Sequence, residues 1–142
     1  MDQRREFLKK AAKLGTAGSM AAMAAAAATG PAARAKVAGG IRLGNLYFSS
    51  GLTGVRDGGG DIKEQTQRIL ELHKANLEGM GSSLGNVLKV TVFLADVKTE
   101  KNAMNEVYGH FFPKDAPARS AFGVQFPDTA TRVEIELVAW IP

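Results

Sequence analysis

The feature that most constrains the fold is the order of hydrophobic periodicities along the second part of the chain. Segments with the two-residue period of a strand are interspersed with segments that have the 3.6-residue period of an amphipathic helix. The first kind predicts strands at 41–43, 46–50, 87–97, 121–126 and 132–141, and the second predicts helices at 62–80 and 99–112. The resulting order, β-β-α-β-α-β-β, predicts one α+β domain with both helices on one face of a mixed sheet.

Local signals support the two helices. Asp61 is a suitable N-cap for the first helix, and Glu64 three residues later would complete a capping box. His73 falls on the apolar stripe of the same helix, so we expect a hydrogen-bonded structural imidazole and not a catalytic one. Pro113 ends the second helix, because its ring cannot continue a helical backbone.

The first 35 residues have the three parts of an export signal. A basic start with Arg4 and Arg5 precedes an uncharged stretch from Leu14 to Ala28, and Ala33-Arg34-Ala35 resembles a cleavage site. The Arg-Arg-x-Phe-Leu-Lys order matches the twin-arginine pattern except for Gln3. We therefore expect export to the periplasm by the twin-arginine machinery, with cleavage after Ala35. A stable membrane anchor is not expected, because the stretch is short and mostly alanine.

The charge distribution separates this leader from the rest of the chain. Residues 1–35 hold six of the 18 Lys and Arg and two of the 14 Asp and Glu, so residues 36–142 hold twelve of each. A neutral domain gives no support to nucleic-acid binding. The absence of cysteine excludes disulfides, thiol catalysis and cysteine metal sites.

Arg119 is the most unusual residue for its position. It lies in Pro117-Ala118-Arg119-Ser120, where a proline-led loop is expected to enter an apolar strand, and a rigid entry suits bidentate capture of a carboxylate. From spacing alone, a surface arginine paired with an acid is the simpler interpretation. Glu134, on what we take to be the adjacent last strand, is a candidate for that acid or for an acid–base group.

The last strand also has a mixed second face. Arg132, Glu134, Glu136, Val138 and Trp140 alternate with the apolar residues of that strand. A face that combines carboxylates with a tryptophan is typical of an assembly surface or of the lining of a site.

Several motifs follow one another between residues 41 and 139: Leu43-Gly44-Asn45, Ser49-Ser50-Gly51, Val90 to Asp96, Asn105 to Phe112, Pro117 to Ser120 and Val133-Glu134-Ile135. In this order they resemble the Rid family (reactive intermediate deaminase, YjgF-like), also called endoribonuclease L-PSP.

The resemblance implies a chorismate-mutase-like α+β fold, a homotrimer with one ligand site in each cleft between subunits, and no metal or organic cofactor. It implies hydrolysis of 2-imino or 2-enamino acids to 2-oxo acids and ammonia. Arg119 would bind the carboxylate of a small-molecule substrate and Glu134 would position the attacking water. The rest of the pocket would be lined by Ser50, Gly51, Asn105 and the Ala121 backbone.

Two positions depart from the family pattern. Val37 stands where members usually carry a pocket tyrosine, and Ala121 stands where many carry a cysteine. The missing tyrosine favours an alternative function, a non-catalytic trimer that binds small carboxylates. The pairing of Arg119 with Glu134 favours the enzyme. A ribonuclease ranks last, because residues 36–142 have no net charge and export would separate the protein from RNA.

Overall fold

The computed structural model describes residues 32–56 and 59–142, and within this range it confirms the predicted α+β fold. The strands are β1 (Arg34–Val37), β2 (Gly40–Leu43), β3 (Leu46–Ser49), β4 (Leu52–Thr53), β5 (Val87–Leu94), β6 (Ala118–Gly123) and β7 (Val133–Trp140). The helices are α3 (Ile62–Gly79), the 3-10 turn η1 (Leu84–Asn86) and α4 (Val97–Phe111). The predicted order omits β1 and β4, each of which is short.

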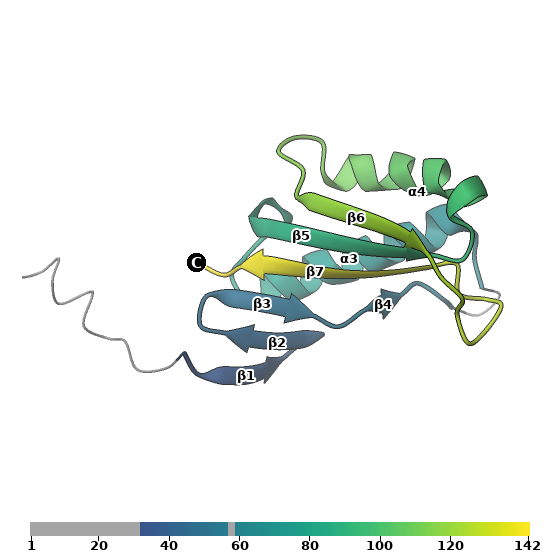
Figure 1. The fold of residues 1–142 in the computed structure, drawn as a ribbon. Coiled ribbons are helices and arrows are strands. Elements are labelled where there is room, and N and C mark those ends of the chain that lie inside the picture. Colours follow the sequence, from purple (N-terminus) through teal and green to yellow (C-terminus); the bar gives the residue numbers. More distant parts are fainter. Residues whose placement is uncertain (1–31, 57–58) are drawn as a thin grey trace, which may run out of the picture. The chain divides into compact units, whose positions relative to one another are not determined.

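The strands form one mixed sheet in the order β1-β2-β3-β7-β5-β6, with β4 paired to β7 (Figure 1). Strand β7 is central: it pairs antiparallel with β3, β4 and β5. Strands β5 and β6 are parallel and are joined by α4, as a parallel pair requires a crossover connection. Strand β5 therefore separates β6 from β7, and the predicted adjacency of the Arg119 and Glu134 strands is wrong.

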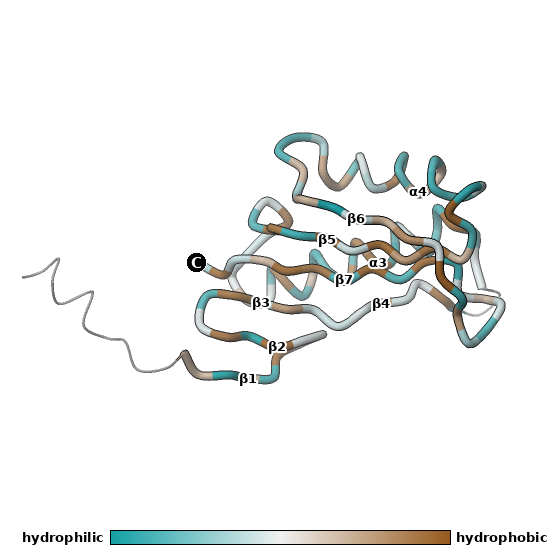
Figure 2. Tube along the Cα trace, in the orientation of Figure 1, coloured by the Kyte–Doolittle hydropathy of each residue, from teal (hydrophilic) through white to brown (hydrophobic). Residues whose placement is uncertain are grey.

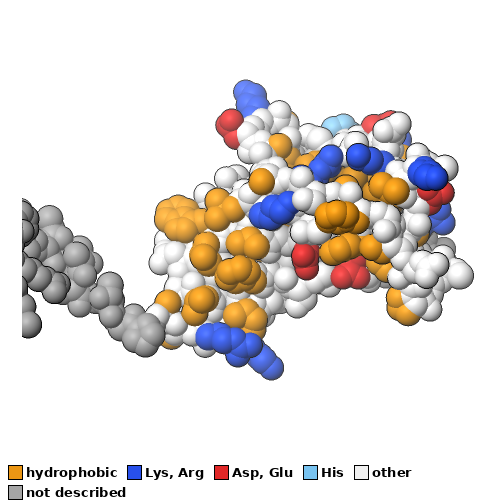
Figure 3. All heavy atoms as spheres, viewed as in Figure 1, with side chains coloured by type: hydrophobic (Ala, Val, Ile, Leu, Met, Phe, Trp, Pro, Cys, Tyr) orange, Lys and Arg blue, Asp and Glu red, His pale blue; other side chains and the backbone are white. Residues whose placement is uncertain are grey.

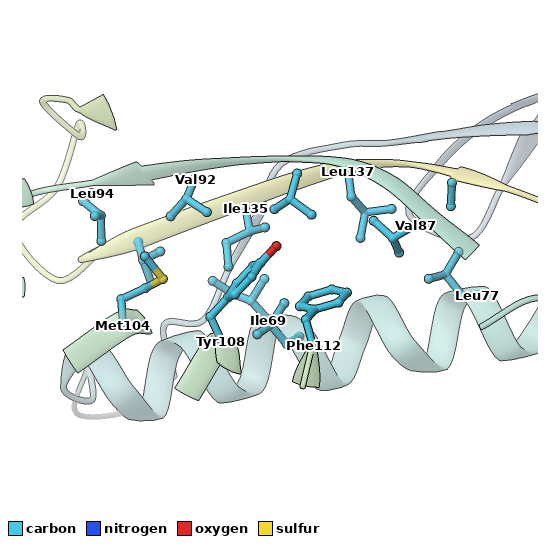
Figure 4. Packing of buried hydrophobic residues seen from close by; sticks show 14 of the residues in the cluster. Ile69, Leu77, Val87, Val92, Leu94, Met104, Tyr108, Phe112, Ile135 and Leu137 are labelled. Atoms are coloured by element: carbon cyan, nitrogen blue, oxygen red, sulfur yellow. The ribbon is translucent and has the colours of Figure 1, made fainter. Parts of the chain in front are cut away.

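Both helices cover the same face of the sheet, and the hydrophobic core lies between the helices and that face (Figure 4). Strand β7 supplies Val133, Ile135, Leu137 and Ala139 to this core, all of them almost fully buried. In Figure 2, hydrophobic segments run through β7 and much of β5. The alternation along these strands thus determines which sheet face is covered.

Helix α3 has the predicted start and the predicted histidine. Asp61 and Glu64 form the capping box. His73 is fully buried, and its Nε2 donates a hydrogen bond of 2.9 Å to the Ile135 carbonyl of β7. Burial lowers the pKa of His73, and the hydrogen bond to the carbonyl opposes this shift in part. The imidazole therefore joins α3 to the central strand in its neutral form.

The opposite sheet face has no helix over it. Figure 3 looks onto this open face and shows hydrophobic side chains with acidic ones among them. The large side chains exposed there include Phe48, Phe122 and Trp140, each between two-fifths and just over one-half exposed. Glu134, Glu136 and Val138 of β7 are partly buried on the same face, as the alternation predicted.

The leader prediction lies mostly outside the described residues, which begin at residue 32. The predicted cleavage site is part of the sheet and not a free segment. Arg34 and Ala35 are the first two residues of β1 and pair with Leu43 and Arg42. Cleavage after Ala35 would remove half of β1. No helix in the described ranges is long and apolar enough to cross a membrane.

Candidate functional site

The predicted site residues divide between the two faces of the sheet. Arg119 and Ala121 lie in register with Val90 and Val92, which are fully buried under the helices. Residues in register on neighbouring strands point to the same face. Arg119 and Ala121 therefore lie on the helix face, on the edge strand β6.

Arg119 belongs to strand β6 itself, which begins at Ala118; the predicted loop position and the predicted start of this strand at Ala121 are wrong. The parallel pairing with β5 extends the strand toward Pro117. The guanidinium carbon of Arg119 lies 4.4 Å from the centre of the Tyr108 ring on α4. No described carboxylate forms an ion pair with it, so the surface ion-pair interpretation is not supported.

Two polar atoms on α4, the helix that carries Tyr108, are buried without a hydrogen-bond partner among the described residues: Asn105 Oδ1 and the Tyr108 hydroxyl. The two residues are three positions apart, so they are neighbours on one helix face. Burial raises the pKa of the Tyr108 hydroxyl, and the Arg119 cation opposes this shift. We call Asn105, Tyr108, Arg119 and Ala121 the arginine half-site.

Glu134 lies on the other face. It is in register with Thr53 and Phe93, and its neighbour Ile135 points into the core. Gly51 lies directly against it: a methyl group added at Gly51 would overlap the Glu134 carboxylate oxygen Oε1. Strands β3 and β4 both pair with β7, but the residues between these two strands do not. Gly51 lies in this unpaired segment, which places it over the carboxylate.

Ser50 is next to this glycine and is exposed. Its backbone N–H donates a hydrogen bond of 2.8 Å to the Gly39 carbonyl, which ties the segment to the turn between β1 and β2. The preceding Ser49 hydroxyl accepts a hydrogen bond of 2.8 Å from the Leu137 N–H. We call Ser50, Gly51 and Glu134 the glutamate half-site.

One chain therefore does not bring the predicted site together. The arginine half-site lies on the helix face at the sheet edge, and the glutamate half-site lies on the open face, with β5 between their strands. Periodicity correctly predicted the face of Glu134. It gave no face for Arg119 and no contact between Arg119 and Tyr108, because both depend on the register between β5 and β6, which leaves no local signal in the sequence.

A hollow of about 110 Å³ lies on the open face beside the glutamate half-site. It is lined by Phe48, Ser49, Lys89, Thr91, Glu136, Leu137 and Val138. Lys89 Nζ donates a hydrogen bond of 2.7 Å to the Ser120 hydroxyl. None of the predicted site residues lines this hollow.

Val37, at the position of the family's pocket tyrosine, is partly buried and packs against the hydrophobic core. Within residues 32–56 and 59–142, no group of three or more His, Cys, Asp or Glu side chains is arranged to hold a metal ion.

Comparisons with known proteins agree on one family. The family described as Endoribonuclease L-PSP matches residues 27–141. The chain is 40% identical over 105 residues to a RutC family protein of Pyrococcus abyssi, covering 70% of this chain and 82% of that protein. It is 36% identical over 80 residues to the human 2-iminobutanoate/2-iminopropanoate deaminase, covering 56% and 58%. The crystal structure of yeast Mmf1 matches with a TM-score of 0.67 and 31% identity, covering 79% and 92%.

Proposed function

This chain belongs to the endoribonuclease L-PSP family, and on that premise we propose that it hydrolyses reactive 2-imino and 2-enamino acids to 2-oxo acids and ammonia. The observation that carries the proposal is the state of Arg119. Its guanidinium packs over a tyrosine ring and has no ion-pair partner among the described residues, which leaves its N–H donors available for a substrate carboxylate. The name of the human relative supports the same substrate class.

Arg119 would bind the substrate through two parallel hydrogen bonds to the carboxylate. A guanidinium presents its donors in a planar fork, so it fixes both the position and the orientation of the bound acid. The imine carbon is then held in one place relative to the attacking water. For an electrophilic carbon this orientation supplies most of the rate enhancement.

Glu134 would act as the proton acceptor. The water oxygen forms a bond to the imine carbon, the C=N electron pair moves to nitrogen, and the carboxylate takes a proton from the water. The carboxylate passes this proton to nitrogen, which gives a carbinolamine. It then takes the hydroxyl proton and passes it to nitrogen as the C=O bond forms and the C–N bond breaks, which releases ammonia and leaves the 2-oxo acid. An imine carbon is already electrophilic, so the step requires orientation and one proton shuttle. No cofactor is invoked.

Because one chain keeps the two half-sites on different sheet faces, we propose that the site is completed between copies in a homotrimer. The arginine half-site of one copy would face the glutamate half-site of the next. The large hydrophobic side chains on the open face support such an assembly, because exposed apolar patches of this kind mark protein contacts. The pocket would lack a phenol at Val37 and a thiol at Ala121.

We place this activity in the periplasm. The proposal rests on the sequence pattern of the leader, and the twin-arginine machinery would be the chain's partner during export. The substrate would be the by-product of an exported oxidase or dehydratase, since such reactions release imines and enamines.

The alternative is a trimer that binds small carboxylates without turning them over. The absence of the pocket tyrosine at Val37 favours it. Cleavage of RNA ranks last, since residues 36–142 carry equal numbers of basic and acidic side chains.

The decisive experiment generates 2-iminobutanoate in place with an amino-acid oxidase and adds the full chain. We expect ammonia release above the spontaneous rate. Arg119→Lys keeps the charge but loses the fork, so 2-oxobutanoate binding should weaken by roughly tenfold to a few hundredfold. Arg119→Ala should abolish saturable binding.

Glu134→Gln separates the two functions. Binding of 2-oxobutanoate should be largely retained, and hydrolysis should be lost, because an amide cannot accept the proton. Glu136→Gln is the matched control, since Glu136 lies two residues along the same face of β7. If wild-type protein binds 2-oxo acids but never accelerates ammonia release, the alternative function, a trimer that only binds small carboxylates, is the correct one.

A further inference from the structure

The side chain under Arg119 is the ring of Tyr108. The distance of 4.4 Å from the guanidinium carbon to the ring centre is well inside the range of a cation–π contact. Arg119 lies on an edge strand, so strand pairing restrains its backbone on one side only. The side chain needs a second support to keep one orientation.

The acidic side chains of α4 do not supply that support. Glu100 is paired with Arg132, and Glu106 is paired with Lys63. A carboxylate beside Arg119 would occupy its N–H donors and compete with an acidic ligand. An aromatic face attracts the cation without using any of those donors.

The ring itself is firmly placed. Tyr108 is only 6% exposed. Its ring packs against that of Phe112 with 4.7 Å between ring centres (Figure 4). The helix that carries both is capped at its start by Asp96, which accepts hydrogen bonds from the Lys98 and Thr99 backbone. A buried ring on a capped helix is a rigid platform.

We propose that Tyr108 is a positioning residue: its ring holds the Arg119 guanidinium in the orientation in which the fork meets the substrate carboxylate. The inference rests on the proposed function for the identity of the ligand. It assigns the role to the ring face and not to the hydroxyl, which has no hydrogen-bond partner among the described residues.

The test compares Tyr108→Phe with Tyr108→Leu in the full chain. Phenylalanine keeps the ring, so the dissociation constant for 2-oxobutanoate should stay within about twofold of wild type. Leucine removes the ring, and binding should weaken about 5- to 30-fold, the range expected for loss of a partly buried cation–π contact. Phe111→Leu is the matched control: it removes a partly buried ring from the same helix and should leave binding within about twofold.

A second readout needs no ligand. Protons above an aromatic face are shifted upfield, so the Arg119 Nε–H signal in a ¹H–¹⁵N spectrum should be upfield in wild type and Tyr108→Phe. It should return to the ordinary position in Tyr108→Leu. The signal is assigned by its absence from Arg119→Lys.

Folded Tyr108→Leu protein that binds 2-oxobutanoate as tightly as wild type would overturn the inference. So would Tyr108→Phe protein that loses as much affinity as the leucine variant, since the hydroxyl would then be responsible. Wild-type protein with the upfield signal but no affinity for 2-oxo acids would support the positioning contact and contradict the proposed function alone.

Discussion

At the scale of single residues, Gly51 is constrained by its neighbour and not by its own backbone. It lies so close to Glu134 that any side chain would overlap the carboxylate. Gly51→Ala should therefore displace the carboxylate while the fold is kept. A shift of about 1 Å in a reacting group costs about 100-fold in rate, so imine hydrolysis should fall by about that factor.

The control for this variant is Gly79→Ala, because a methyl group there would meet nothing within 4 Å beyond its own chain neighbours and helix backbone. Its rate should be that of wild type. A Gly51→Ala enzyme with full activity would show that the carboxylate position does not limit hydrolysis.

His73 makes stability depend on pH. Its pKa is lowered in the folded state from the ordinary value of 6.5, so the unfolded chain binds the proton more readily. The free energy of unfolding should be highest above pH 6.5 and should decrease as the pH falls from 6.5 toward the lowered pKa. Urea unfolding at pH 7.5, 6.5 and 5.5 measures this.

His73→Gln should flatten that part of the profile, because the amide can donate to the Ile135 carbonyl but does not titrate. His110→Gln is the control, since His110 is exposed near the end of α4, and it should leave the slope as in wild type. Equal slopes in all three proteins would exclude His73 as the cause.

At the scale of elements, the open sheet face is the surface expected to assemble. Phe48 on β3 lies in register with Val138 of β7 on this face and is 42% exposed. Light scattering of the full chain should give three times the mass of one chain, stable on dilution. Phe48→Asp should shift the protein toward monomers and reduce 2-oxobutanoate binding with it.

Leu72→Asp is the matched control, because Leu72 is exposed to a similar extent, 44%, but lies on α3. It should remain trimeric. If wild-type protein is a monomer at micromolar concentration, the proposal of a site between subunits is wrong.

Elements differ in how far the sequence predicts them. The two long helices and β7 follow from periodicity and caps, because those signals are local. Strands β1 and β4 are too short to show alternation. The placement of β6 beside β5 depends on pairing across α4, which no local pattern encodes, so the sequence does not predict that Arg119 lies within a strand. The partition of the site between two faces follows from the same pairing.

At the scale of the whole molecule, the leader can be tested independently of the enzyme. Arg4→Lys combined with Arg5→Lys should trap the precursor in the cytoplasm, because the twin-arginine route reads the pair itself. The mature protein should begin near Lys36 by N-terminal sequencing, and β1 would then keep only its second half. Normal periplasmic appearance of the double variant would refute this export route.

The central place of β7 also decides when the chain can fold during synthesis. The Leu137 N–H bonds to the Ser49 hydroxyl, 88 residues earlier in the chain. At typical translation rates, roughly 4 to 18 s separate the two residues on the ribosome. Until β7 emerges, β3 and β5 lack the strand that lies between them in the folded sheet, so they cannot form their backbone hydrogen bonds to it. The sheet can therefore close only late in synthesis, and until then the nascent chain exposes the apolar residues that β7 will pair with and cover.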